Sequence, residues 1–240
     1  MARRESKFGV FLMQQYDILR PNEKFKGKTY GQWAEEWWKN LLSKDPDGYK
    51  KDDDVVFLRG NYDYVDKGEK REPNTKPNIN KRTGKDGLVI CEGTGLFFPV
   101  VAAEFNEGDS DPDNEKRILR NEDDCYMCAK RDIDEGPTPS VDQATINGDP
   151  IVDNLGPYRA KSEYFRLEVP ENSSLRTKME YEMPAGKPMA VTDGYWILIK
   201  SLTASDTPYR VRFSATGRNQ PKTNQYSNVG EYDIMVQRCG

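Results

Sequence analysis

The chain of 240 residues is long enough for one large domain, and its 35% hydrophobic and 32% charged content makes it more polar than an ordinary globular protein. The 13 Tyr, 9 Phe and 4 Trp residues can still fill a core, which argues against a disordered chain. A formal net charge of −4 without any basic stripe argues against nucleic acid as a partner.

Residues 1–27 are predicted to form an N-terminal arm, followed by a single domain over residues 28–240. The arm is basic at first and then carries an apolar patch, which packs either on its own domain or on a neighbouring subunit. The side chains that we expect to make partner contacts are Phe8, Val10, Phe11, Leu12, Met13 and Tyr16. Polar residues interrupt the patch, and no segment reaches roughly 18 apolar residues, so we expect neither a signal peptide nor a membrane contact.

An amphipathic helix is predicted to begin at Thr29, because Thr29 and Gln32 have the spacing of a capping box. Tryptophan and leucine side chains then recur at helical intervals, and the turn residues of 45–48 end the segment. The tryptophans could form a platform for stacking sugars, but a buried stripe is more common, since each aromatic ring removes roughly 150–250 Å² from water. The side chains that we therefore assign to the core are Trp33, Trp37 and Trp38.

Three apolar runs between residues 55 and 103 are predicted to be β-strands. They cover 55–60, 88–91 and 96–103, and Pro99 predicts a bulge or an edge in the last run, because proline lacks an amide hydrogen. A loop insertion at 61–87, rich in Lys, Asn, Pro and Gly, separates the first two runs. The aromatic side chains of these runs that we assign to the core are Phe57, Phe97 and Phe98.

Residues 104–140 are acidic and irregular, so we interpret them as a second long loop insertion. Its carboxylates resemble a calcium-binding loop, since hard cations bind clustered oxygen atoms. The glycine and the final glutamate of an EF-hand loop are both missing from their positions, which rejects that specific motif. A looser calcium site at Asp109, Asp111 and Asp113 is an alternative to a solvated acidic loop, and we expect no cofactor.

The four cysteines leave three interpretations open. Cys125 and Cys128 have the spacing of half a zinc site, which Cys91 and Cys239 would complete with four thiolates. A disulfide between two of the four is the second interpretation, although four cysteines are too few for a disulfide scaffold in a chain of this length. Reduced thiols without a special role are the third, and it is the one that we favour.

Apolar and polar side chains alternate after position 140, as they do in strands with one face in water. Asn147-Gly148 predicts a two-residue hairpin turn, and Asp193-Gly194 predicts a turn ahead of a strand that carries the core residue Trp196. These short strands predict a mainly β fold, an antiparallel, jelly-roll-like β-sandwich with one amphipathic N-terminal helix and long loops. The alternating segments are 164–169, 195–199, 209–213 and 232–236.

Histidine is absent from the chain, which removes Ser-His-Asp and Cys-His catalysis and every histidine-bearing zinc site. The sequence also contains no glycine-rich phosphate loop. Both observations favour a protein that binds or assembles over an enzyme, although a carboxylate-dependent hydrolase stays open. Carbohydrate binding through the loop aromatics Tyr62, Tyr64 or Tyr126 is the other alternative.

Several segments together resemble an uncharacterised, β-rich family of bacterial and phage-encoded proteins. The matching segments, in order over residues 25–238, are 27–33 (GKTYGQW) with Trp37-Trp38, 55–60 (VVFLRG), 96–100 (LFFPV) and 193–196 (DGYW). The resemblance implies a shared fold, and the family offers no established activity or catalytic residues to carry over. Members that lack a leader suggest a phage virion, whose parts are made and assembled in the host cytoplasm.

We therefore expect a structural protein of a virus particle, such as a capsid-decorating or fibre-associated subunit, and not an enzyme. Its partners would be other virion or assembly subunits, with self-association into a homo-oligomer as a further option. The expected mechanism is docking of the N-terminal arm and an edge of the sandwich onto a neighbouring subunit.

Overall fold

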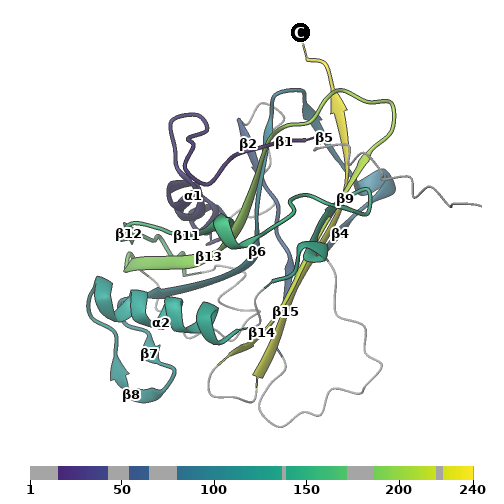
Figure 1. Cartoon of the computed structure of the whole chain (residues 1–240). Coiled ribbons are helices and arrows are strands. Elements are labelled where there is room, and N and C mark those ends of the chain that lie inside the picture. The colour runs from purple at the N-terminus through teal and green to yellow at the C-terminus, as the bar shows by residue number, and fades with distance from the viewer. Residues whose placement is uncertain are drawn as a thin grey trace, which may run out of the picture.

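The computed structural model describes residues 16–42, 54–64, 80–136, 139–171, 186–219 and 224–239, and it is mainly β (Figure 1). Two large sheets, a two-stranded ribbon and two α-helices make up this described part of the chain. The expected mainly β fold class is therefore confirmed. No helix within the described ranges is both long and apolar enough to cross a membrane.

The first sheet is built around two long antiparallel strands, β6 (Gly95–Asn106) and β13 (Met189–Ser201). Strand β2 pairs with β6 in parallel, and three short strands pair with β13 in antiparallel orientation. The bounds of these shorter strands are Asp17–Ile18 (β1), Val55–Phe57 (β2), Arg159–Lys161 (β11) and Phe165–Arg166 (β12).

The second sheet is built around β14 (Tyr209–Asn219) and β15 (Asn224–Gln237), which form a long antiparallel pair. Strands β4 and β5 both run parallel to β15, so the expectation of a purely antiparallel fold is wrong. The chain returns to these strands by long crossover connections, which place neighbours in the same direction. The shorter strands are Asn61–Tyr64 (β3), Asn80–Arg82 (β4), Leu88–Cys91 (β5), Ala144–Ile146 (β9) and Asp149–Pro150 (β10).

Helix α1 (Tyr30–Leu42) covers the face of the first sheet that points away from the second sheet. Its start confirms the expected capping box. The amide of Thr29 donates to Gln32 Oε1 at 3.0 Å, and the amide of Gln32 donates to Thr29 Oγ1 at 3.4 Å. Trp37 anchors the helix, because its indole is fully buried and donates to the carbonyl oxygen of Leu58 at 2.9 Å.

The aromatic side chains assigned to the core lie on both faces of the first sheet. Phe97 and Trp196 are fully buried beneath α1, where their rings stack at a centroid distance of 5.2 Å. Phe98 lies on the opposite face and stacks on Phe213 of the second sheet at 4.7 Å. Each such ring contributes about 1.5–3 kcal/mol through burial, so the two contacts fix both layers against the sheet. Of the other assigned residues, Trp33 is buried, and Trp38 and Phe57 are partly buried.

Pro99 produces the bulge that the sequence predicts. Tyr195 pairs with Val101 and Trp196 pairs with Pro99, so Val100 has no partner of its own on β13. The alternative of an edge position is wrong, because β6 lies between β13 and β2 in the interior of the sheet. Beyond this extra residue, each side chain of β6 lies on the opposite face of the sheet from the one that regular alternation would give it. The bulge therefore decides which face carries the polar side chains at the end of β6.

Helix α2 (Glu122–Glu135) shows that the interpretation of residues 104–140 as an irregular loop, and the expectation of a single helix, are wrong. Asn121 caps the helix by accepting a hydrogen bond from the amide of Asp124 at 3.0 Å. The acidic residues of the first turn complement the helix dipole. The same acidic composition suggested a loop, but at the start of a helix it is a stabilising signal.

Asp193 and Gly194 lie inside β13, so the expected turn at this position is wrong. A Cβ atom on Gly194 would lie 2.5 Å from the carbonyl oxygen of Val101, which shows that the glycine allows two strands to approach closely. Asp193 is buried and paired with Arg159. The dipeptide therefore has the composition of a turn, but Gly194 allows close packing of two strands and Asp193 forms an ion pair.

The hairpin at Asn147-Gly148 is confirmed. Ile146 pairs with Asp149 across the turn, and both turn residues have positive φ, 55° at Asn147 and 94° at Gly148. This conformation matches the twist of a two-residue hairpin, which explains the preference for Asn-Gly. The loop expected at 61–87 is wrong in part, because β3 and β4 lie within it, while 65–79 lie outside the described residues.

Cys91 and Cys239 form a disulfide, and Cys125 and Cys128 are free and buried. The parallel pairing of β5 with β15 ends with Cys91 opposite Gln237, which brings Cys239 beside Cys91. The favoured expectation of four reduced thiols is therefore wrong, and so is the four-thiolate zinc site. A disulfide between two of the four cysteines was the alternative that the structure shows.

Candidate interaction site

Residues 107–135 form a lobe, called the α2 lobe below, at one end of the first sheet. It contains α2 and the ribbon of β7 (Ser110–Asp111) and β8 (Asn114–Ile118). Figure 1 shows the ribbon beyond α2, on the side of the molecule away from the C-terminus. The buried face of α2 packs against β6 and β13 through Cys125, Cys128, Ala129 and Ile133.

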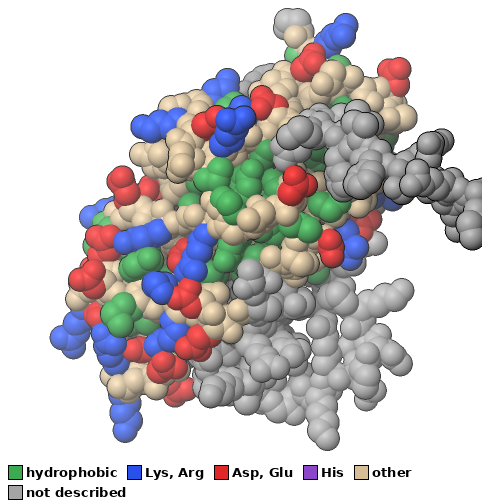
Figure 2. Space-filling view, in the orientation of Figure 1, with side chains coloured by type: hydrophobic (Ala, Val, Ile, Leu, Met, Phe, Trp, Pro, Cys, Tyr) green, Lys and Arg blue, Asp and Glu red, His purple; other side chains and the backbone are tan. Residues whose placement is uncertain are grey.

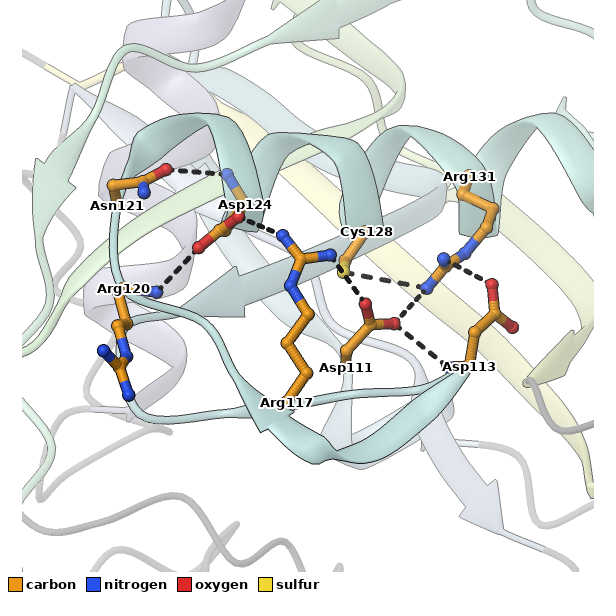
Figure 3. A network of polar contacts seen from close by, with 8 residues as sticks. All are labelled: Asp111, Asp113, Arg117, Arg120, Asn121, Asp124, Cys128 and Arg131. Carbon is orange, nitrogen blue, oxygen red and sulfur yellow. Dashed lines mark hydrogen bonds and ion pairs between the residues drawn. The ribbon is translucent and has the colours of Figure 1, made fainter.

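Asp111 is the centre of the ion-pair network that joins the ribbon to α2 (Figure 3). Its buried carboxylate accepts hydrogen bonds from Arg117 Nη1 and Arg131 Nη2, each at 3.0 Å, and from the amide of Asp113 at 3.0 Å. Burial raises the pKa of Asp111, but the bonds from Asp113 and Arg131 outweigh it and hold the pKa below its usual range. The carboxylate is therefore ionised at neutral pH.

Each arginine of the network also reaches a second carboxylate. Arg117 pairs with Asp124 in the first turn of α2, and Arg131 Nη1 lies 2.5 Å from Asp113. Asp124 in turn accepts a hydrogen bond from the amide of Arg120 at 3.2 Å. Figure 3 shows both guanidinium groups between ribbon and helix, so the network connects the two elements at two points.

The two free thiols lie under this network and are held in their protonated form. Burial raises the pKa of Cys125 to about 12 and that of Cys128 to about 11, and neighbouring carboxylates add to both shifts. Arg131 Nη2 approaches Cys128 Sγ at 3.7 Å, which only partly offsets the burial. A protonated, buried thiol is a poor nucleophile, so the Cys-x-x-Cys pair is not arranged for redox chemistry.

A second ion pair fixes the other end of α2 to the sheet. Arg159 binds both oxygens of Asp193, with the shortest contact at 2.6 Å, and its Nη1 lies 2.6 Å from Asp134 on α2. The side chains of Arg159 and Asp193 lie 34 residues apart in the chain, so only the fold brings them together. Their bidentate geometry is the strong form of an arginine–carboxylate contact.

The buried side chains of Glu104 and Asn106 and the partly buried Asp109 form a polar group at the base of the lobe. Glu104 is 4% exposed and Asn106 is fully buried. Burial and the neighbouring Asp109 carboxyl hold the pKa of Glu104 well above its usual range, and burial raises the pKa of Asp109 to about 6. None of the described residues offers a well-aligned hydrogen bond to Glu104 Oε1 or to either polar atom of the Asn106 amide.

The structure separates the three aspartates of the calcium alternative. Asp109 accepts a hydrogen bond from the amide of Asn106 at 2.8 Å, whereas Asp111 and Asp113 are bound by arginines. In the described ranges, no three His, Cys, Asp or Glu side chains are gathered in an arrangement that could hold a metal ion.

The residues expected to bind partners or sugars are only partly within the structure. Of the six arm residues expected to contact a partner, only Tyr16 is described, and its ring contacts Tyr209 edge-on at 6.4 Å. The other five, Phe8, Val10, Phe11, Leu12 and Met13, lie outside the described residues. The side chains of Tyr62 and Tyr64 also lie outside what is described. Tyr126 is partly buried, and Lys161 Nζ lies 4.0 Å from its ring centroid, so this face of the ring is covered.

Sequence reasoning missed the whole arginine–carboxylate network. The helical spacing of Cys125, Cys128, Ala129 and Ile133, together with Asn121 before an acidic turn, was the available signal for α2. The partners of Arg117 and Arg131 had no local signal. Chemically, the paired guanidinium and carboxylate groups hold the ribbon, the helix and the sheet together.

Comparison of the chain with protein-family models, with curated proteins and with solved structures finds no match in any of the three. The resemblance to a bacterial and phage family therefore stays a prediction from the sequence.

Proposed function

We propose that this chain is a non-enzymatic structural protein that acts through protein–protein contacts at the α2 lobe. In its specific form the proposal is a capsid-decorating or fibre-associated subunit of a virus particle, with neighbouring subunits of the same assembly as partners. The interpretation of the two packed sheets as a jelly-roll-like sandwich belongs to the same proposal. Parallel strands β2, β4 and β5 would be additions to that architecture.

The observation that carries the proposal is the position of exposed hydrophobic side chains. Three large hydrophobic side chains are exposed among the described residues, and two of them, Ile118 at 42% and Met127 at 62%, belong to the α2 lobe. Every residue of β8 is exposed as well. Figure 2 shows acidic and basic side chains mixed over this part of the surface, as in the polar rim of an interface.

The arginine network supports the proposal because it fixes the lobe before a partner binds. A two-stranded ribbon alone is marginally stable in water. Here Arg117 and Arg131 tie the ribbon to α2, and Arg159 ties α2 to the sheet. A surface that is already ordered loses less conformational entropy on binding, which favours tight association.

Mass spectrometry of purified particles from the native source tests the proposal. We expect the chain in a fixed ratio to the major particle protein, and its absence from intact particles would refute a structural role. Particles carrying Ile118→Asp together with Met127→Asp should lose the chain at least tenfold. Lys85→Glu, a charge change in the distant 3-10 turn Gly84–Asp86, is the matched control and should leave incorporation unchanged.

A further inference from the structure

The polar group at the base of the α2 lobe has no role in the contacts described so far. Beyond the bulge in β6, Glu104 and Asn106 point to the same side of the sheet, because alternate residues of a strand share a face. Asp109 follows after a short turn and closes back on Asn106 through its 2.8 Å hydrogen bond. The three side chains therefore come together from one strand end and the turn after it.

Among the described residues, none provides this group with a positively charged partner. No described lysine or arginine lies close enough to lower the pKa of Glu104 or Asp109. Asn106 lies within reach of both carboxyl groups, yet its Oδ1 has no well-aligned donor among the described residues. Burying carboxyl oxygen atoms in this way is unfavourable unless a proton or another cation neutralises them.

We propose that Glu104, Asn106 and Asp109 form a binding site for a hard metal cation, with Ca²⁺ as the ion that fits best. Carboxylate and amide oxygens are the ligands that hard cations take, and the nearby Cys125 thiol is a soft ligand that such cations do not favour. Calcium accepts irregular sets of oxygens completed by backbone carbonyls and water, whereas Mg²⁺ requires near-ideal octahedral geometry. Two carboxyls and one amide make a low-charge site, so affinity falls in the weak range of calcium modules, about 10⁻⁴–10⁻³ M.

This site differs from the calcium alternative considered from the sequence, with which it shares only Asp109. Asp111 and Asp113 are bound by Arg131 and stand outside it. Glu104 and Asn106, which the sequence placed in the second loop insertion, lie in β6 and provide its buried part. The inference also stands apart from the proposed partner contacts, since it concerns the base of the lobe and not its exposed surface.

Calcium binding is tested on the full chain, first freed of metal with a chelator, at pH 8. Thermal unfolding is followed as CaCl₂ is added against NaCl of equal ionic strength. Calcium at about 100 times its Kd should raise Tm by roughly 5–10 °C, with a smaller shift for MgCl₂. Glu104→Gln keeps the shape of the side chain and should weaken binding at least tenfold, whereas the exposed Asp123→Asn should leave the calcium response unchanged.

Terbium luminescence gives a second measurement that does not depend on the folding of a variant. Trp38 donates a hydrogen bond to Thr192, the residue opposite Glu104 on β13, so its indole lies near enough to transfer energy to a bound Tb³⁺. We expect sensitised emission that calcium displaces. No Tm shift and no sensitised emission would overturn the proposal, as would an unchanged calcium response in Glu104→Gln. A third outcome would also overturn the proposal: calcium has no effect, and stability falls more steeply with rising pH in the wild type than in Glu104→Gln. In that case a proton, and not a metal ion, neutralises the site.

Discussion

Replacing Asp111 by asparagine tests whether the ion-pair network stabilises the α2 lobe. Asparagine keeps the size of the side chain but removes its charge, so both guanidinium groups lose their ionic partner. Charge-assisted hydrogen bonds contribute about 1.5–3 kcal/mol each. Arg117 and Arg131 are 44% and 23% exposed, which screens both contacts, so we expect Asp111→Asn to cost about 2 kcal/mol in total.

The measurement is urea unfolding together with hydrogen exchange of the ribbon amides. A loss of 2 kcal/mol corresponds to a fall in Tm of about 4–8 °C for a chain of this size. The pKa of Asp111 is lowered in the folded state, so its contribution is present above about pH 4 and lost as pH falls through the folded pKa. The difference between Asp111→Asn and the wild type should therefore shrink below pH 4.

Asp113→Asn is the matched control, because Asp113 is 53% exposed and pairs with the same Arg131 through its other terminal nitrogen, Nη1. We expect it to change the free energy of unfolding by less than about 0.5 kcal/mol. If both variants behave alike, or if exchange in residues 110–118 is unchanged in Asp111→Asn, the network does not hold the ribbon and the reasoning fails.

Three further predictions concern other parts of the fold. Burial raises the pKa of Asp132 to about 7, so the folded state retains a proton that the unfolded state releases near pH 4. Stability should therefore fall between pH 4 and 7, a slope to which Glu104 and Asp109 also contribute. Asp132→Asn should reduce that slope and gain about 2 kcal/mol at pH 8 by urea titration. Gly194→Ala should cost about 3 kcal/mol by the same titration, because its Cβ would lie 2.5 Å from the Val101 carbonyl oxygen. Cys91→Ala should cost about 3–5 kcal/mol under oxidising conditions, since the disulfide closes a loop of 148 residues.

Each of these variants has its own control. Asp134→Asn, on the same helix but with a lowered pKa, should not reduce the slope between pH 4 and 7. Gly148→Ala has open space around the new Cβ, so any cost there comes from positive φ and not from overlap. A reducing agent should abolish the difference between Cys91→Ala and the wild type, and a difference that persists would contradict the disulfide as its cause.

Local signals in the sequence were sufficient for elements that depend on neighbouring residues. The capping box at Thr29 and Gln32 defined the start of α1, and Asn147-Gly148 defined the hairpin. Pro99 predicted the bulge for a reason internal to the residue, its missing amide hydrogen. In each case the residues that give the signal lie at the feature itself or within a few positions of it.

Features that depend on distant partners were not accessible in the same way. Asp193-Gly194 has the composition of a turn, and only the approach of Val101 explains why glycine stands inside a strand. The acidic residues before Cys125 suited both a loop and a helix start, and packing on the sheet decided between them. The candidate site was the least predictable feature from the sequence, because the partners of Asp111 come from both a ribbon and a helix.

The covalent link at the end of β15 also determines how the molecule carries a mechanical load. Strand β15 pairs with β5 in parallel up to Gln237, and the bond between Cys239 and Cys91 lies just beyond. Tension applied at residue 239 therefore passes directly into β5 and pulls two strands along their length together. Without the bond the same tension would enter the sheet through β15 alone, and only hydrogen bonds would pass it on to β5 and β14.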